Sequence, residues 1–312
     1  MIPILRLSFL TAGLFAVAAV ASAAIERTVE KTFPVSGAGL LRVETQGGAI
    51  EVDPTGGSAV KVVLRQKIRA DTDAEADELL KKIELTLEQN GNDVTVISKY
   101  PSKTGFSWNG NPVRIDIVVE VPAAFATQLK TSGGNITVGD LTGKLDVRTS
   151  GGSIKLGNLG GTADARTSGG NIVLASAAAA VNLDTSGGNI AVGRVAGSAK
   201  LETSGGDIRI DAASGSLQAR TSGGSIRAAL VGPLSADSSL GTSGGSVRVT
   251  VDPKAAFRLD ASTSGGSVDA DGLTITLEGS SRSRSKLAGT VNGGGPVLKL
   301  RSSGGSILVR TN

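Results

Sequence analysis

The sequence predicts an all-β protein whose main body is a parallel β-solenoid, or β-helix, of about 18-residue coils. Two observations predict this class. Apolar residues alternate with polar ones on both sides of a recurring tetrapeptide, Thr-Ser-Gly-Gly. Six copies of the tetrapeptide follow one another at a constant spacing, starting at Thr131, Thr149, Thr167, Thr185, Thr203 and Thr221. A unit this short buries too little apolar surface to fold alone, so such repeats stack and share a core.

The first residues of the chain predict a secretory signal peptide over residues 1–23. The segment has one basic residue near its start, Arg6, then an apolar stretch over residues 7–20, and Ala-Ser-Ala at residues 21–23, which fits signal peptidase cleavage. An uncleaved membrane anchor is the alternative, because the apolar stretch approaches the length that spans a bilayer. We expect an exported protein, periplasmic or secreted to the cell surface, with no transmembrane segment in the mature chain.

Residues 24–130 predict an N-terminal β-rich capping region that contains one short helix. A capping box from Thr72 to Glu75 predicts a helix over Asp73–Ile83, with Lys81 and Lys82 in its last turn, where positive charge favours the helix dipole. The end coils of a solenoid lack one neighbour and therefore need a cap. Alternation of apolar and polar residues predicts strands over residues 40–44, 59–68, 84–89, 93–98 and 113–121.

Residues 131–312 are predicted to form the β-solenoid repeats. In the first copy, residues 131–148, the apolar side chains alternate within two short runs. Alternation broken by Gly-rich corners predicts two strands and two turns per coil, with one buried face. Equivalent strands should then stack in parallel and in register, roughly 4.8 Å apart. The apolar positions of this copy are Ile136, Val138, Leu141, Leu145 and Val147.

The Gly-Gly pair of each repeat is predicted to make a sharp corner, because glycine reaches positive φ without a steric clash. The Thr of the motif continues the inward alternation, so its hydroxyl should bond to the backbone at the corner. The position after Gly-Gly carries Asn, Ser or Asp from Asn135 to Ser306. Such side chains are expected to bond to their equivalents in the coils above and below.

The regular spacing is lost toward the C-terminus. The copies at Thr242 and Thr263 each follow after a slightly longer interval, and the last copy, at Ser302, follows after a much longer one. Residues 279–295 interrupt the period and are predicted to form an extruded loop with several basic residues. One related motif, Thr45-Gln-Gly-Gly, lies far upstream of the array.

The composition excludes several classes of function. The chain has no Cys and no His, so disulfides, thiolate metal sites and a histidine general base are excluded. The net charge is only +4 and aromatic residues make up 3%, which argues against a nucleic-acid partner. Calcium-binding solenoid repeats need an aspartate on every turn, and only Asp207 follows a Gly-Gly pair. We therefore predict no catalytic residues, no metal site and no cofactor.

Three arginines form the first candidate contact site. Arg209, Arg227 and Arg248 are predicted to occupy one outward column on successive coils, about one strand spacing apart. Their mutual repulsion would be relieved by a bound polyanion such as a phosphorylated or acidic glycan. The plainer interpretation is a row of solvated arginines balanced by nearby acids, as where Arg166 precedes Asp184 in another outward column.

An aromatic segment forms the second candidate site. Residues 100–111 are rich in Gly, Ser and Asn, and they hold Tyr100, Phe106 and Trp108, which include the single Tyr and the single Trp of the chain. Aromatic side chains in an exposed loop stack on sugars or on a partner protein. The alternative is a structural plug over the first coil.

The sequence resembles an exported β-strand-repeat family of unknown function whose members are often labelled putative adhesins. The resemblance rests on the leader, Gly-Gly-Ala-Ile at residues 47–50, the acidic helix, Val-Glu-Val-Pro at residues 119–122, and coils of the form Leu-x-Val-x-Thr-Ser-Gly-Gly-x-Ile-x-Val. It covers nearly the whole mature chain. The resemblance implies an envelope or surface protein that binds a partner, and the family has no agreed catalytic residues.

These observations together predict an exported, non-enzymatic, adhesin-like protein that binds a glycan or another cell-envelope component through its solenoid faces. A structural scaffold that assembles by end-to-end association is the first alternative. A polysaccharide-active enzyme is the second, because β-helix enzymes can work with carboxylates alone. The sequence leaves the ligand and the oligomeric state open.

Overall fold

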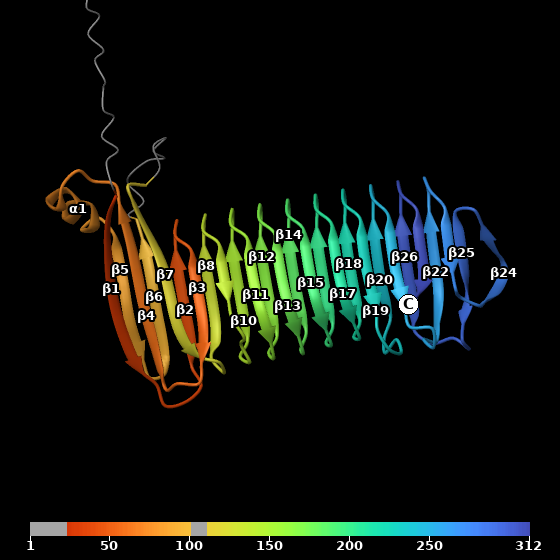
Figure 1. Ribbon diagram of the computed structural model, residues 1–312, viewed down its shortest axis with the longest axis horizontal. Helices are drawn as coiled ribbons and strands as arrows, with labels where there is room; N and C mark the ends of the chain where they lie inside the picture. Colours follow the sequence, from red (N-terminus) through yellow and green to blue (C-terminus); the bar gives the residue numbers. More distant parts are fainter. Residues whose placement is uncertain (1–23, 101–110) are drawn as a thin grey trace, which may run out of the picture.

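The computed structural model describes residues 24–100 and 111–312, apart from the side chains of residues 278–282, and shows an elongated stack of strands (Figure 1). Two long sheets run the length of the stack, sheet A with 13 strands and sheet B with 14. Inward side chains of both sheets form one continuous apolar core. The predicted all-β solenoid is therefore confirmed.

The spatial order of the strands differs from their chain order at both ends of the stack. Counted from the N-terminal end, sheet A consists of β1 (Ile25–Pro34), β4 (Ala59–Ile68), β7 (Val113–Pro122), β3 (Ile50–Thr55), β9 (Ile136–Val138), β11 (Ile154–Leu159), β13 (Ile172–Ala177), β15 (Ile190–Val195), β17 (Ile208–Ala213), β19 (Ile226–Leu230), β21 (Val247–Val251), β27 (Ile307–Thr311) and β23 (Val268–Asp271). Sheet B consists of β5 (Glu84–Asn90), β6 (Asp93–Lys99), β2 (Leu40–Thr45), β8 (Ala126–Thr131), β10 (Leu145–Thr149), β12 (Ala163–Thr167), β14 (Val181–Thr185), β16 (Ala199–Thr203), β18 (Leu217–Thr221), β20 (Ser238–Thr242), β26 (Val297–Ser302), β22 (Phe257–Thr263), β25 (Lys286–Val291) and β24 (Ile275–Ser283).

Each repeat forms one rung, defined as a sheet B strand, the Thr-Ser-Gly-Gly corner and the sheet A strand that follows. The rungs stack in parallel and in register, because Ile154 lies beside Ile136 on one neighbouring strand and beside Ile172 on the other. All three side chains are fully buried. The predicted common apolar column is therefore confirmed, and one rung corresponds to one copy of the repeat.

The stack departs from chain order at its N-terminal end. β2 and β3 flank the upstream corner at Thr45, and they pair in parallel with β8 and β9. On their other side they pair in parallel with β6 and β7, which lie later in the chain. Parallel rungs therefore extend into residues 24–130, the segment for which the sequence predicts a cap.

Antiparallel strands cover this end of the stack. In sheet A, β4 pairs with β7, and β1 pairs with β4. In sheet B, β5 pairs with β6. β1, β3 and β8 are absent from the strands that the sequence predicts for residues 24–130, and β1 is hard to recognise because most of its side chains are exposed. The reversed strand direction ends the parallel array and leaves a charged outer edge.

The helix α1 (Asp73–Leu80) lies at the same end of the molecule (Figure 1). The Thr72 hydroxyl caps it by accepting from the Glu75 N–H at 3.2 Å, as the capping box predicts. The helix is shorter than predicted, and Lys81 is its C-cap. The backbone N–H of Ile83 donates to the Leu80 carbonyl at 3.0 Å, which tightens the last turn before β5 begins.

The C-terminal end also departs from chain order. β26 inserts between β20 and β22 in sheet B, and β27 inserts between β21 and β23 in sheet A. The predicted extruded loop over residues 279–295 is wrong. Much of this segment belongs to β24 and β25, which pair with each other and extend sheet B antiparallel to β22. The hairpin forms because the last apolar rung needs cover, and Leu287 and Val291 are buried there.

Candidate functional site

The threonine of each corner joins two rungs. The Thr149 hydroxyl donates to the Gly134 carbonyl of the preceding rung at 3.0 Å, and it accepts from the Gly152 N–H of its own corner at 3.2 Å. The same pair of bonds recurs at Thr167, Thr185, Thr203 and Thr221. These threonines are buried. The predicted inward orientation and backbone bonding of the Thr column are confirmed, so this column is structural.

The reason predicted for the Gly-Gly pair is wrong. Positive φ occurs at several glycines among the described residues, but none of them belongs to a Thr-Ser-Gly-Gly corner. The second glycine is needed because adjacent rungs approach closely: a Cβ on Gly152 would lie 1.9 Å from the Gly134 carbonyl oxygen. The first glycine is less constrained, since a Cβ on Gly133 would meet no atom within 4 Å.

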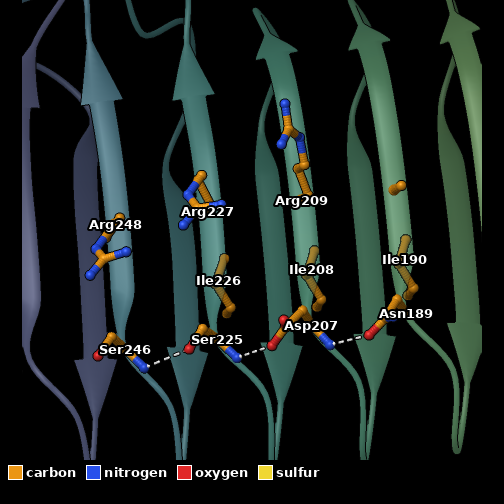
Figure 2. Close-up of a pocket in the computed structure, with 11 residues that line it drawn as sticks. Asn189, Ile190, Asp207, Ile208, Arg209, Ser225, Ile226, Arg227, Ser246 and Arg248 are labelled. Carbon is orange, nitrogen blue, oxygen red and sulfur yellow. Dashed lines mark hydrogen bonds between the residues drawn. The ribbon is translucent and has the colours of Figure 1, made fainter.

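The residues after Gly-Gly form a hydrogen-bonded ladder, as predicted, and it runs without a break from Asn135 to Ser246. The backbone N–H of Asp207 donates to Asn189 Oδ1 at 2.7 Å, and the Ser225 N–H donates to Asp207 Oδ1 at 2.6 Å. The Ser246 N–H then donates to Ser225 Oγ at 3.1 Å. Figure 2 shows these bonds as one row that crosses the lower ends of successive sheet A strands. In this row, each side chain therefore accepts from the backbone N–H of the residue that follows Gly-Gly in the next corner.

The arginine column stands directly above this row (Figure 2). Arg227 lies in register with Arg209 on β17 and with Arg248 on β21, and all three side chains are exposed. The predicted geometry of one outward column on successive coils is thus observed. A shallow groove of about 410 Å³ runs along it, with the polar ladder on one side and the guanidinium groups on the other.

The three arginines differ in their partners. Arg209 Nε contacts Asp211 Oδ1 of its own strand at 2.7 Å. Arg227 and Arg248 have no ion pair or side-chain hydrogen bond with any residue that the structure describes. Positive charge is therefore least compensated at the β19 and β21 end of the groove, where an anion would gain most.

The balancing acids that the plainer interpretation invokes lie within strands rather than across rungs. Arg166 Nη2 contacts Asp164 Oδ2 at 2.9 Å, two residues away, although Asp184 is its neighbour on the next rung. Arg148 and Asp146 repeat this arrangement at 3.2 Å. Arg42, Arg148 and Arg166 of sheet B are therefore each paired with an acid of their own strand, whereas Arg227 and Arg248 of sheet A are not.

Of the aromatic candidates, only Tyr100 belongs to the described residues, and Phe106 and Trp108 lie outside them. The Tyr100 hydroxyl donates to the Val113 carbonyl, and its backbone N–H donates to Gln46 Oε1 at 2.8 Å. Burial raises the pKa of Tyr100 to about 12. Its phenol is thus engaged with the rung formed by β6 and β7 instead of pointing freely into solvent.

A second groove on sheet B, of about 610 Å³, contains residues that sequence reasoning did not select. It lies over β20 and is lined by Arg220, Ser239, Gly241, Lys299 and Arg301, among others. Lys299 and Arg301 come from β26, which reaches this position only through the inserted rung. No local signal in the sequence places them beside Arg220.

Two further properties concern the described part of the chain. No helix there is long and apolar enough to cross a membrane. Nor does that part hold a group of three or more Asp and Glu side chains that could bind a metal ion. Asp207, the acid in the lining of the arginine groove, accepts from the Ser225 N–H. Asp211, on the same strand as Arg209, contacts that arginine.

Several solved structures are similar to this chain over most of its length, and all are distant in sequence. A putative adhesin from Parabacteroides distasonis is 14% identical with a TM-score of 0.44, and the match covers 92% of this chain and 97% of that one. A putative lipid binding protein from the same organism is 14% identical with a TM-score of 0.38, covering 90% of this chain and 96% of that one. A putative adhesin from Bacteroides fragilis is 14% identical with a TM-score of 0.36, covering 92% and 97%.

The family is established by the sequence itself. Among curated proteins, none matches this chain. The family model described as Toastrack DUF4097 matches residues 49–310, which includes every regular rung of the solenoid and the inserted rung near the C-terminus. The chain therefore belongs to the Toastrack DUF4097 family.

Proposed function

We propose that the protein is exported to the cell envelope and binds an acidic glycan, or another acidic envelope component, along sheet A without catalysing a reaction on it. The register of the arginine column carries this proposal. Arg209, Arg227 and Arg248 stand on consecutive strands beside one groove. A linear polyanion lying along the solenoid axis would meet one positive charge at every strand spacing, roughly 4.8 Å.

The charges favour binding by several weak contacts rather than by one strong contact. Exposed ion pairs contribute only about 0.2–1 kcal/mol each, because water and salt screen them. A ligand that engages three arginines at once adds these contributions while the entropic cost of association is incurred once. The affinity should therefore depend on ligand length and fall as salt concentration rises.

Export and the absence of catalysis rest on the sequence. Residues 1–23 have the organisation of a secretory signal peptide. The absence of Cys is compatible with an oxidising compartment, and the absence of His removes the commonest general base. The carboxylate of Asp207, in the lining of the arginine groove, accepts from the Ser225 N–H, and that of Asp211 contacts Arg209, which supports a binding role.

The test is retention of the mature chain, residues 24–312, on immobilised acidic glycans and on cell-envelope fractions. The variant Arg209→Ala/Arg227→Ala/Arg248→Ala removes the column. A matched control, Arg42→Ala/Arg148→Ala/Arg166→Ala, removes the same charge from sheet B, where each arginine contacts an acid of its own strand. We expect the column variant to bind at least about tenfold more weakly and the control to bind normally.

Two outcomes would overturn the assignment. Unchanged retention of the column variant would show that these arginines do not contact the ligand. Equal losses in both triple variants would show that net charge, and not the column, determines retention.

A further inference from the structure

The groove over β20 has an unusual floor. The two outward positions of this strand hold Ser239 and Gly241, whereas the outward positions of the adjoining strands hold longer side chains. Gly241 lies in register with Arg220 on β18 and with Arg301 on β26, and Ser239 lies in register with Lys299. The result is a trough one strand wide, with Gln218 and Arg220 on one wall and Lys299 and Arg301 on the other. The walls are two strand spacings apart, or roughly 9.5 Å between strand axes.

The fold does not require the small residue at Gly241. Its φ is outside the positive range, and a Cβ there would meet nothing closer than 3.9 Å. This contrasts with Gly245 in the following corner, where a Cβ would lie 2.2 Å from the Gly224 carbonyl oxygen. Glycine inside a strand lowers stability and supplies no packing, so its benefit at this position lies in the open space above it.

Cations face this space from both walls. Arg220 on one wall and Lys299 on the other have no ion pair or side-chain hydrogen bond within the described chain. Arg301 is partly neutralised, because its guanidinium donates to the carboxylate and the carbonyl of Asp260. Two acids, Asp184 and Glu202, also line the groove on the strands beyond Arg220. Glu202 lies in register with Arg220 and contacts Lys200 at 3.3 Å. The trough therefore holds two positive charges that no carboxylate of the described residues contacts.

Hydroxyl groups also line the trough. Ser222, Ser243 and Ser303 are exposed at the corner end of the trough, and Ser239 lies on its floor. None of these four hydroxyls has a hydrogen-bond partner among the residues that the structure describes. They can donate to or accept from a ligand that itself carries several hydroxyls. Strong cation contacts and several weak hydroxyl contacts together suit a sugar better than a bare inorganic anion.

We propose that the trough over β20 is a binding site for an anionic sugar, meaning a saccharide that carries a carboxylate or a phosphate group. The anionic group lies between Arg220 and Lys299, and the sugar hydroxyls contact the serine row. The Gly241 gap admits the ring. This site belongs to sheet B, so it is separate from the arginine column of sheet A and does not depend on the function proposed for that column.

The site is tested by calorimetric titration of residues 24–312 with uronic acid oligosaccharides, sugar phosphates, neutral oligosaccharides and inorganic phosphate. Gly241→Tyr fills the trough without changing its charge, and Arg220→Gln removes one wall. Arg148→Gln, on the strand β10 of the same sheet and outside the lining, is the matched control. We expect each trough variant to weaken anionic sugar binding about tenfold or more and Arg148→Gln to leave it within about twofold.

The titrations also show whether the anionic group of the ligand is a carboxylate or a phosphate, because they compare the affinity for a uronic acid with the affinity for a sugar phosphate. Neutral oligosaccharides should bind at least about tenfold more weakly than either, and inorganic phosphate likewise. Equal binding of inorganic phosphate and of sugars would overturn the proposal, as would unchanged binding by Gly241→Tyr or by Arg220→Gln. The sheet A variant Arg209→Ala/Arg227→Ala/Arg248→Ala keeps the trough. It should bind a uronic acid monosaccharide, which is too short to span the arginine column, as tightly as the unchanged chain does, and this separates the two sites.

Discussion

The Ser302 hydroxyl donates to the Gly245 carbonyl at 2.8 Å, although 57 residues separate them in the chain. The last corner of the sequence thus rests on the corner at Thr242. The corner at Thr263 stacks on the other side, where the Thr263 hydroxyl donates to the Gly305 carbonyl at 2.6 Å. The final rung is consequently an internal part of the stack and not its end.

Truncation after residue 296 should therefore disorder more than the residues it removes. Loss of β26 and β27 leaves β22 and β23 without a parallel neighbour, and the hairpin β24–β25 is attached to the sheet through β22. We expect hydrogen exchange to show loss of protection over residues 257–291 while residues 131–221 stay protected. Removal of Asn312 alone is the control and should change neither region. Protection of residues 257–291 in the truncated chain would contradict the internal position of this rung.

The buried Thr column gives a test of the corner hydrogen bonds. Thr167 donates to the Gly152 carbonyl at 2.8 Å and accepts from the Gly170 N–H at 3.3 Å. Thr167→Val keeps the shape but leaves both backbone groups without this partner, so we expect a loss of about 2 kcal/mol or more in the free energy of unfolding. Thr167→Ser keeps both bonds and loses one methyl group, which costs about 1 kcal/mol. Denaturant titration of both variants measures the difference, and equal losses would exclude a role for the hydroxyl.

The two glycines of one corner should respond differently to an added methyl group. A Cβ on Gly134 would lie 1.9 Å from the Gly48 carbonyl oxygen, whereas one on Gly133 would meet nothing within 4 Å. We expect Gly134→Ala to lower the free energy of unfolding by about 3 kcal/mol, because adjacent rungs must separate. Gly133→Ala should be nearly neutral, since its φ is not positive. Thermal unfolding checks both, and similar losses in the two variants would contradict the close-approach argument.

The interior of the solenoid is predictable from sequence because its determinants are local. Ile136, Ile154 and Ile172 fall in one column when the repeats are aligned, and the neighbours in space are also the neighbouring repeats in the chain. Alignment of the repeats could not give the reason for the second glycine. That reason is the distance between backbones of adjacent rungs, which appears only once the corners are stacked.

The ends are less predictable because spatial order and chain order separate there. The Thr45 corner looks isolated in the sequence, yet β2 lies beside β8. In the same way, Lys299 reaches the trough beside Ser239 only because β26 inserts next to β20. The arginine column of sheet A could be recognised because its three members lie on successive repeats of the chain. The sheet B trough could not, because the repeats that carry its two walls are far apart in the sequence.

The ionisation of Tyr100 can be followed directly, because it is the only tyrosine of the chain. Burial favours the neutral phenol and raises its pKa from 10.0 to about 12. The raised pKa of Tyr100 contributes to the free energy of unfolding. This contribution is fully present below pH 10, which corresponds to the pKa in the unfolded chain, and it is lost as the pH rises through about 12. We expect the ultraviolet absorbance of tyrosinate in the native protein to show a midpoint near 12. A midpoint near 10 would place the phenol in solvent, and Tyr100→Phe should abolish the signal.

Deletion of one whole rung provides the most direct test of the stacking register. Removing residues 167–184 takes out one complete repeat and joins Arg166 to Thr185, so every later side chain keeps its face. Removing residues 167–183 leaves one extra residue and shifts the following strand by one position, which turns its buried side chains outward. We expect the first variant to unfold cooperatively with a smaller denaturant slope, because less surface is buried. The second should bind a hydrophobic dye and lose cooperative unfolding, since the inward side chains that follow the deletion, such as Ile190, can no longer share one core. The two deletions differ by a single residue, and only the first removes a whole repeat. If the chain tolerated both deletions equally, the complete repeat would not be the structural unit of the stack.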